Sequence, residues 1–134
     1  MLKNKKLFDC IPFYQSNLLF EVRLKTLDHL VDYFVVCEAT KTHTGHKKEL
    51  NFDLKKFKNL SDKIRYIVVD DLPDPESLKH KKYPLYNFQI NKLAEGIIDA
   101  KEDDLILVSD EDEIPNPDAI SKFEYDNFKY GIFL

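Results

Sequence analysis

Four acidic residues stand side by side at positions 110–113, directly after an apolar run that predicts a buried strand. Adjacent carboxylates repel one another, and the cost is high where a chain leaves a low-dielectric core. A hard divalent cation such as Mg2+ or Mn2+ would offset this charge, because these ions prefer oxygen ligands. In an extended backbone, Asp110 and Asp112 point to the same side and Glu111 to the other. The spacing therefore predicts a metal site with Asp110 and Asp112 as ligands.

Three other interpretations of the acidic segment start from the same residues. A solvated turn is the structural alternative, since charged runs are usually exposed. A phosphatase of the haloacid dehalogenase type also places D-x-D after an apolar strand, with the first Asp as nucleophile beside Mg2+. That pattern calls for a small hydroxyl residue at the position of Ile114, and its fold opens with the motif. An EF-hand loop is excluded, because Ile114 and Pro115 stand where a ligand and a glycine belong.

Strand-like and helix-like segments alternate along the chain. β-Rich runs cover residues 6–13, 33–37, 64–69, 104–109 and 128–134. Helical patterns or caps cover residues 16–31, 51–60, 90–98 and 116–123, and residues 70–84 form a proline-containing loop. Ser16 or Asn17 can cap the first of these segments, and Asn116 can cap the last. Apolar stripes run along two of them, through Phe20, Leu24, Leu27 and Val31 and through Ile90, Leu93, Ala94, Ile97 and Ile98. This alternation predicts an α/β fold with a mainly parallel sheet flanked by helices and connected by right-handed crossovers.

The polar residues that follow these strands are the candidates for a ligand site. In open parallel sheets, ligands bind outside the carboxyl ends of the strands. We therefore expect residues 13–17, 38–46, 70–74 and 110–113 to converge on one edge of the sheet.

Composition limits the classes of function. A single domain of residues 1–134 is the expected organisation, and a net charge of −4 argues against a general nucleic-acid binder. With three glycines in the chain, neither a Walker loop nor a G-x-G-x-x-G fingerprint is possible, which favours a metal for neutralising phosphate. Cys10 and Cys37 are expected to be reduced core residues, which indicates a cytoplasmic setting. No apolar run approaches the length of a membrane span.

Several polar side chains have a structural interpretation at least as good as a functional one. Glu21 and Arg23 fit an ordinary helix face as well as a functional site. His43 and His46 lack a nearby third ligand, so we expect surface residues and no zinc site.

An ordered set of short motifs matches a known family. They are FDCIPF (residues 8–13), EVRL (21–24), VDYFVVCE (31–38), THTG (42–45) and SDEDEIP (109–115). In this order the chain resembles glycosyltransferase family 17, which includes the enzyme that adds the bisecting β-1,4-linked N-acetylglucosamine to N-glycans.

The resemblance implies a fold, a reaction and a set of site residues. The fold would be GT-A-like, that is Rossmann-like, and incomplete, because the chain resembles the N-terminal, donor-binding portion of a longer protein. The reaction would be metal-dependent, inverting transfer of N-acetylglucosamine from UDP-N-acetylglucosamine to a glycan. A truncated, non-catalytic module that binds a nucleotide sugar is the alternative.

The resemblance also assigns roles to particular residues. Asp112 would ligate Mn2+ or Mg2+ at the donor diphosphate, and Asp110 would contact the ribose or the water molecules bound to the metal. Pro12, Phe13 and Glu38 would adjoin the donor nucleotide. No catalytic base is assigned, and Glu113 is a weak candidate.

Overall fold

The computed structural model of the chain describes residues 4–79 and 83–122, and within them four strands form one parallel sheet. The strands are β1 (Leu7–Phe13), β2 (Tyr33–Ala39), β3 (Ile64–Val69) and β4 (Leu105–Val108), in the order β3-β2-β1-β4. The α-helices are α1 (Asn17–Leu27), α2 (Pro84–Lys92) and α3 (Pro117–Ser121), and the 3-10 helices are η1 (Lys58–Lys63), η2 (Pro75–Leu78) and η3 (Leu93–Gly96). The predicted α/β, Rossmann-like architecture with a parallel sheet is confirmed.

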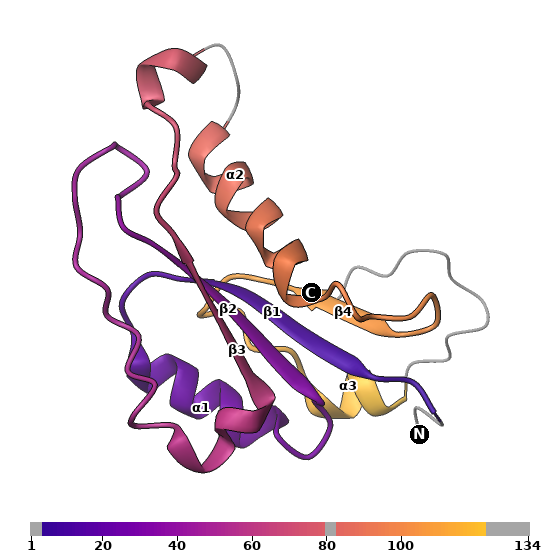
Figure 1. Ribbon diagram of the computed structural model, residues 1–134. Helices are drawn as coiled ribbons and strands as arrows, with labels where there is room; N and C mark the ends of the chain where they lie inside the picture. The colour runs from indigo at the N-terminus through magenta and orange to yellow at the C-terminus, as the bar shows by residue number, and fades with distance from the viewer. Residues whose placement is uncertain (1–3, 80–82, 123–134) are drawn as a thin grey trace.

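Helices cover both faces of the sheet, with α1 and α3 on one side and α2 on the other (Figure 1). The chain first runs outward from β1 through β2 to β3. It then crosses over by α2 and returns to β4 on the other side of β1. The order of strands therefore reverses between β1 and β4, and such a switch point leaves a crevice at the carboxyl ends of its strands.

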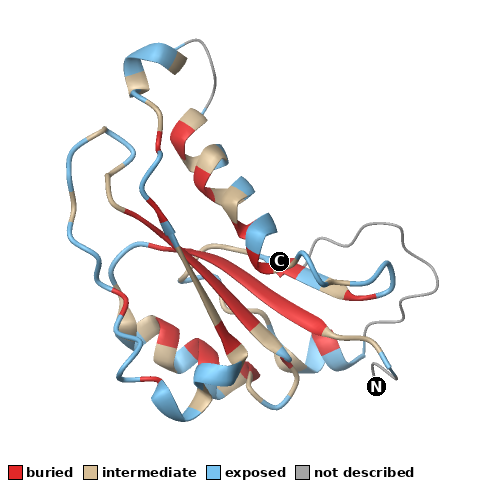
Figure 2. Ribbon diagram, viewed as in Figure 1, coloured by how far each residue is buried: buried red, intermediate tan, exposed pale blue. Residues whose placement is uncertain are grey.

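The central strands β1 and β2 carry the core (Figure 2). Every residue of β1 is buried, as is every residue of β2 after Tyr33. The edge strand β4 differs, since Leu107 is its only buried residue and Val108 is 52% exposed. The prediction of a buried strand before the acidic residues was therefore wrong, because β4 has a described neighbour on one side alone, and its α2-side face is largely uncovered.

The sequence located the starts of α1 and α3 correctly. The Ser16 side chain caps α1 by accepting a hydrogen bond of 3.2 Å from the backbone of Leu19, and the predicted apolar stripe of α1 is buried. Asn116 caps α3 in the same way through the backbone of Asp118 at 2.9 Å, with Pro117 in the first turn.

Two predicted helices have different boundaries. The helix expected at residues 90–98 begins six residues earlier, at Pro84, and its last turn tightens into η3, so Ile98 leaves the apolar stripe and is 86% exposed. The helix expected at residues 51–60 is replaced by turns that lead into η1. The predicted strand at residues 128–134 lies outside the described residues.

Pro12 lies in a central strand without breaking it. The carbonyl groups of Lys6 and Cys10 accept hydrogen bonds from Leu105 and Ser109 on the β4 side. Backbone groups of every second residue in a strand face the same neighbour, so the nitrogen of Pro12, two residues after Cys10, also faces the β4 side. The pairing of β1 with β4 has already ended there, at Cys10 and Val108. Because proline has no N–H to continue the ladder, the chain after β4 departs from the sheet at this point.

Replacing Gly96 tests how closely η3 packs on the sheet. A Cβ at this position would clash with Cγ1 of Val35 and lie 3.3 Å from Cδ1 of Ile67. We expect Gly96→Ala to lower the free energy of unfolding by about 1–3 kcal/mol, the usual cost of overpacking. Urea denaturation would measure the change, and the double variant with Val35→Ala should lose less than the two single variants added together. Strict additivity would contradict the clash.

The two cysteines should be unreactive while the chain is folded. Both are free and buried, and burial raises the pKa of each thiol from 9.0 to about 12. The folded chain therefore keeps thiol protons that the unfolded chain loses above pH 9, so these groups make stability fall as the pH rises from 9 towards 12. At pH 8 an aromatic disulfide reagent should label neither thiol before denaturant is added and both afterwards. Rapid labelling of the native protein would show that the thiols are accessible.

Candidate functional site

A pocket of about 440 Å3 opens at the carboxyl ends of β1 and β2, beside the segment that follows β4. Its remaining wall is one face of α2. The residues that line it are Pro12, Phe13, Tyr14, Ala39, Lys41, Thr42, His43, Thr44, Lys48, Tyr86, Gln89, Asp110 and Glu111. Three of the four predicted polar segments thus meet at one edge of the sheet, while residues 70–74 do not line the pocket. The pocket lies at the switch point between β1 and β4, where such folds bind ligands.

A fully buried ion pair beneath the pocket joins β1 to α1. Arg23 donates from Nε to Oδ2 of Asp9 and from Nη2 to Oδ1, both at 2.7 Å, and both side chains are inaccessible to solvent. Two parallel bonds between a guanidinium and a carboxylate make a strong, strongly directional contact. Arg23 is therefore fixed in both position and orientation.

The remaining donors of Arg23 hold the acidic segment in place. Nη1 donates to the carbonyl oxygens of Asp110 and Glu113 at 2.9 and 3.0 Å, and Nη2 donates to Oγ of Ser109 at 2.6 Å. All five N–H groups of the guanidinium are thus used. Ser109 Oγ in turn donates to the carbonyl of Glu113 at 3.0 Å. The backbone of residues 109–113 is consequently bent around one buried cation.

The bend corrects the sequence-based geometry of the acidic segment. The amide of Glu113 donates to the carbonyl of Asp110 at 3.0 Å, closing a turn where an extended chain was expected. Asp110 and Glu111 line the pocket, whereas Asp112 is exposed in the turn and is not among the lining residues. The expectation that Glu111 turns away from the other two was therefore wrong, because Arg23 draws two carbonyl groups together and reverses the chain direction.

Both pocket-lining carboxylates have hydrogen-bond donors that orient them. The hydroxyl of Tyr86 donates to Oδ1 of Asp110 at 2.8 Å, and the amide of Tyr14 donates to Oε2 of Glu111 at 3.1 Å. Burial, followed by the bond to Asp110, raises the pKa of Tyr86 to about 12, so this hydroxyl stays a donor at neutral pH. Glu113 has a different role, since its carboxylate accepts from the amide of Asp110 at 3.1 Å within the turn.

Glu38 lies in β2, one residue before the end of the strand, and is not among the residues that line the pocket. Its Oε1 accepts hydrogen bonds from Nζ of Lys48 at 2.7 Å and the amide of Asn51 at 2.6 Å. Its Oε2 accepts from the amide of Phe52 at 3.0 Å and the hydroxyl of Tyr66 at 2.8 Å. Burial, and then the bond to Glu38, raise the pKa of Tyr66 well above its usual value. With four donors around a fully buried carboxylate, the geometry favours a supporting role, and direct contact with a donor nucleotide stays a prediction.

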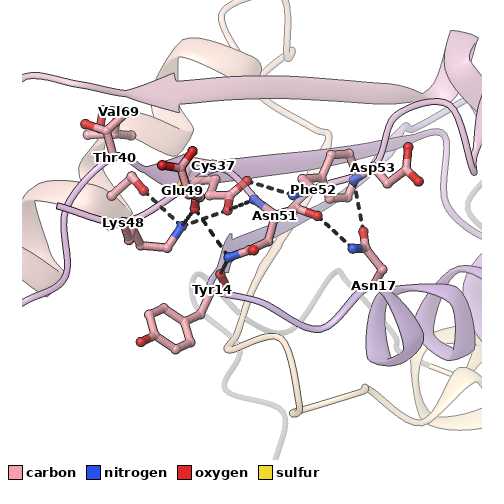
Figure 3. A network of polar contacts seen from close by, with 12 residues as sticks. Tyr14, Asn17, Cys37, Thr40, Lys48, Glu49, Asn51, Phe52, Asp53 and Val69 are labelled. Carbon is pink, nitrogen blue, oxygen red and sulfur yellow. Dashed lines mark hydrogen bonds and ion pairs between the residues drawn. The ribbon is translucent and has the colours of Figure 1, made fainter.

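The segment held by Glu38 braces the end of β1. Figure 3 shows Asn51 between Tyr14 and Asn17, which flank the loop after β1. Nδ2 of Asn51 donates to the carbonyl of Tyr14 at 3.2 Å, and Nδ2 of Asn17 donates to the carbonyl of Asn51 at 2.7 Å. Lys48 lies beside them, its Nζ 5.8 Å from the centre of the Tyr14 ring. The pocket wall formed by Tyr14 is therefore supported from behind.

Sequence reasoning missed four of the pocket's polar and aromatic side chains. Tyr86 and Gln89 lie outside the segments that were expected at this edge. Tyr14 lies inside one of those segments but was not singled out, and His43 lies inside another but was interpreted as a surface residue. Pro84 was the available signal, because proline favours the first position of a helix. A helix that starts at Pro84 places Tyr86 and Gln89 three residues apart on one face.

The described residues offer carboxylate oxygens to a metal without forming a complete metal site. Among residues 4–79 and 83–122, no three His, Cys, Asp or Glu side chains gather closely enough to hold an ion. Asp110 and Glu111 nevertheless face one pocket. Magnesium is commonly held by one or two carboxylates, substrate phosphates and water, so the pocket fits an ion that arrives with a phosphorylated ligand.

Comparison with known proteins gave one match. The family model described as glycosyltransferase family 17 matches residues 1–128. Neither the curated proteins nor the solved structures contain a significant match. None of the helices in the described part of the chain is long and apolar enough to cross a membrane.

Removing one charge from the buried ion pair tests its importance. Asp9→Asn leaves the guanidinium of Arg23 buried without its counter-ion, and we expect a loss of about 3–5 kcal/mol in the free energy of unfolding. Chemical denaturation would measure it. Glu21→Gln is the matched control, since it removes a carboxylate that pairs with Lys25 and Lys56 at the surface and should change stability little. Equal effects of the two variants would contradict the proposed dependence on the buried pair.

Proposed function

The chain belongs to glycosyltransferase family 17, which makes it a glycosyltransferase, and from this premise we propose that its pocket binds UDP-N-acetylglucosamine together with Mn2+ or Mg2+. The observation that carries the proposal is the placement of Asp110 at the switch-point pocket, where the buried Arg23 binds its backbone carbonyl and the Tyr86 hydroxyl binds its carboxylate. A rigidly held oxygen ligand suits a site that must place a cation and a diphosphate accurately.

The charges around the pocket support a phosphorylated ligand. Lys41 and Lys48 line it on the β2 side, and Asp110 and Glu111 line it from the segment after β4. Nζ of Lys48 is already bound to Oε1 of Glu38 and to two carbonyl groups, so Lys41 is the better candidate for direct phosphate contact. A diphosphate with its cation matches this division, because the anion meets the lysine side and the cation meets the carboxylates.

The cation would be held by Asp110, with Glu111 beside it. When bound, it would stabilise the negative charge that develops on the departing diphosphate. Asp112 stays a predicted ligand, but its exposed place in the turn makes Asp110 the residue from which we expect the larger effect. Tyr86 would orient the Asp110 carboxylate throughout.

Transfer to a glycan with inversion is the reaction that we propose for the family member. The acceptor hydroxyl must give up its proton, and Glu113 is a poor base because its carboxylate supports the turn. The family match favours this reaction over the phosphatase alternative.

Donor binding can be tested by calorimetric titration of UDP-N-acetylglucosamine. We expect binding with Mn2+ present, little or none with EDTA, and at least tenfold weaker binding for Asp110→Asn, which loses a charged ligand. Asp112→Asn should have the smaller effect.

Asp118→Asn provides the control, since Asp118 is exposed in α3 and its side chain is not among the pocket-lining groups. It should bind as the wild type does. If UDP-N-acetylglucosamine bound equally well in EDTA, the proposed role of the cation would be contradicted. If it did not bind to the folded wild type at all, the proposed donor would be contradicted.

A further inference from the structure

His43 is the one pocket-lining residue whose ring nitrogen is bonded to a buried amide. Its Nε2 lies 3.0 Å from Oε1 of Gln89, although the His43 side chain itself is exposed in the loop after β2. Gln89 is 4% exposed and projects from α2. The imidazole is thus bonded to the protein through Nε2, and His43 is one of the residues that line the pocket.

Gln89 has a fixed orientation because it makes a two-way contact with Cys37. Its Nε2 donates to the carbonyl of Cys37 at 3.1 Å, while Sγ of Cys37 donates to the carbonyl of Gln89 at 3.3 Å. A carbonyl oxygen can only accept, so the amide group nearest to it must be the NH2. The other end of the amide is then Oε1, which faces His43.

This orientation determines where the proton of His43 lies. Oε1 of Gln89 can only accept, so Nε2 of His43 must donate. In the neutral ring the second nitrogen, Nδ1, then carries a lone pair and no proton. No other hydrogen bond to the His43 ring is found among the described residues. The ring of this pocket-lining residue consequently has a hydrogen-bond acceptor at Nδ1, because the core-held Gln89 fixes the proton on Nε2.

The place of His43 indicates which part of a ligand it meets. Its ring packs edge-on against Tyr86, with 5.9 Å between centroids and an interplanar angle of 85°. The hydroxyl at the end of the Tyr86 side chain is the group that bonds Asp110. In a nucleotide sugar the reacting carbon adjoins the diphosphate, so it belongs near Asp110. The nucleobase is the part that extends away from the phosphates, so we place the nucleobase beside His43.

The rest of the pocket suits a flat, polar-edged ring. Tyr14 is 51% exposed and offers an aromatic surface to the same pocket, with its backbone held by Asn51. Aromatic side chains stack on nucleobases of every kind, so stacking gives affinity without selection. Selection requires hydrogen bonds to the edge of the base.

We propose that Nδ1 of His43 accepts a hydrogen bond from the imide N–H of uracil and thereby selects uridine nucleotides against cytidine nucleotides. The imide nitrogen of uracil carries a proton, whereas the corresponding nitrogen of cytosine presents a lone pair that would face the lone pair of Nδ1. The inference rests on the proposed function, because it names the residue that reads the base of the same donor.

Three nucleotides in calorimetric titrations with Mn2+ test the proposal. UDP, CDP and N3-methyl-UDP share the diphosphate and differ at the ring nitrogen. We expect CDP and N3-methyl-UDP to bind the wild type at least about tenfold more weakly than UDP, since each leaves Nδ1 facing a group that cannot donate. His43→Ala should weaken UDP binding and bring UDP and CDP close to equal affinity.

Two further variants separate the base contact from other effects. His43→Asn should keep part of the preference for UDP, because its side-chain oxygen can take the place of Nδ1. His46→Ala removes the other exposed histidine of the loop, which does not line the pocket, and should change nothing.

Nitrogen-15 spectra of the histidine side chains provide a readout besides binding. At pH 8 they should show Nε2 protonated and Nδ1 unprotonated for His43. The reverse tautomer would overturn the proposal, as would equal binding of UDP and CDP to the wild type. Equal binding of UDP and CDP would leave the proposed donor site intact. If none of the three nucleotides bound, both the donor site and the selection of the base by His43 would be contradicted.

Discussion

The buried ion pair between Asp9 and Arg23 is the interaction on which the geometry of the pocket depends. Taking two charges out of water is costly unless every donor finds a partner, and Arg23 meets this condition with five hydrogen bonds. Lysine could not do the same, because its ammonium lacks the planar fork that reaches a carboxylate and two carbonyls together. The central strand, the first helix and the turn after β4 are thereby fixed by one side chain.

A second buried carboxylate does similar work at the other side of the pocket. Glu38 anchors residues 48–52 as Arg23 anchors residues 109–113, and in both cases the partners include main-chain groups of a loop. Gln89 adds a third anchor by joining α2 to the backbone of β2. Many side chains of the pocket therefore belong to loops, but buried side chains hold the backbone of these loops in place. A site on loops becomes preorganised in this way.

The sequence predicted what depends on local pattern and failed where distant contacts decide. Alternating strands and helices, the caps at Ser16 and Asn116 and the gathering of polar strand ends were all visible in advance. The turn at residues 110–113 could not be predicted, because Arg23, whose guanidinium bends it, lies 87 positions before Asp110 in the chain. The early end of α2 was also hidden, since the tight approach of Gly96 to Val35 is a tertiary contact. His43 looked like a surface residue because its partner, Gln89, is 46 positions away.

Pro12 has a consequence for how the sheet assembles. Parallel strands can pair in several alignments that differ by two residues, and each keeps the same side chains on the same face. An alignment that carried β4 further along β1 would set a backbone carbonyl against the ring nitrogen of Pro12, which cannot donate. Such a misaligned sheet would lack a hydrogen bond at its centre. Pro12 therefore disfavours such misaligned pairing, and the pairing of β4 with β1 ends at Cys10 and Val108.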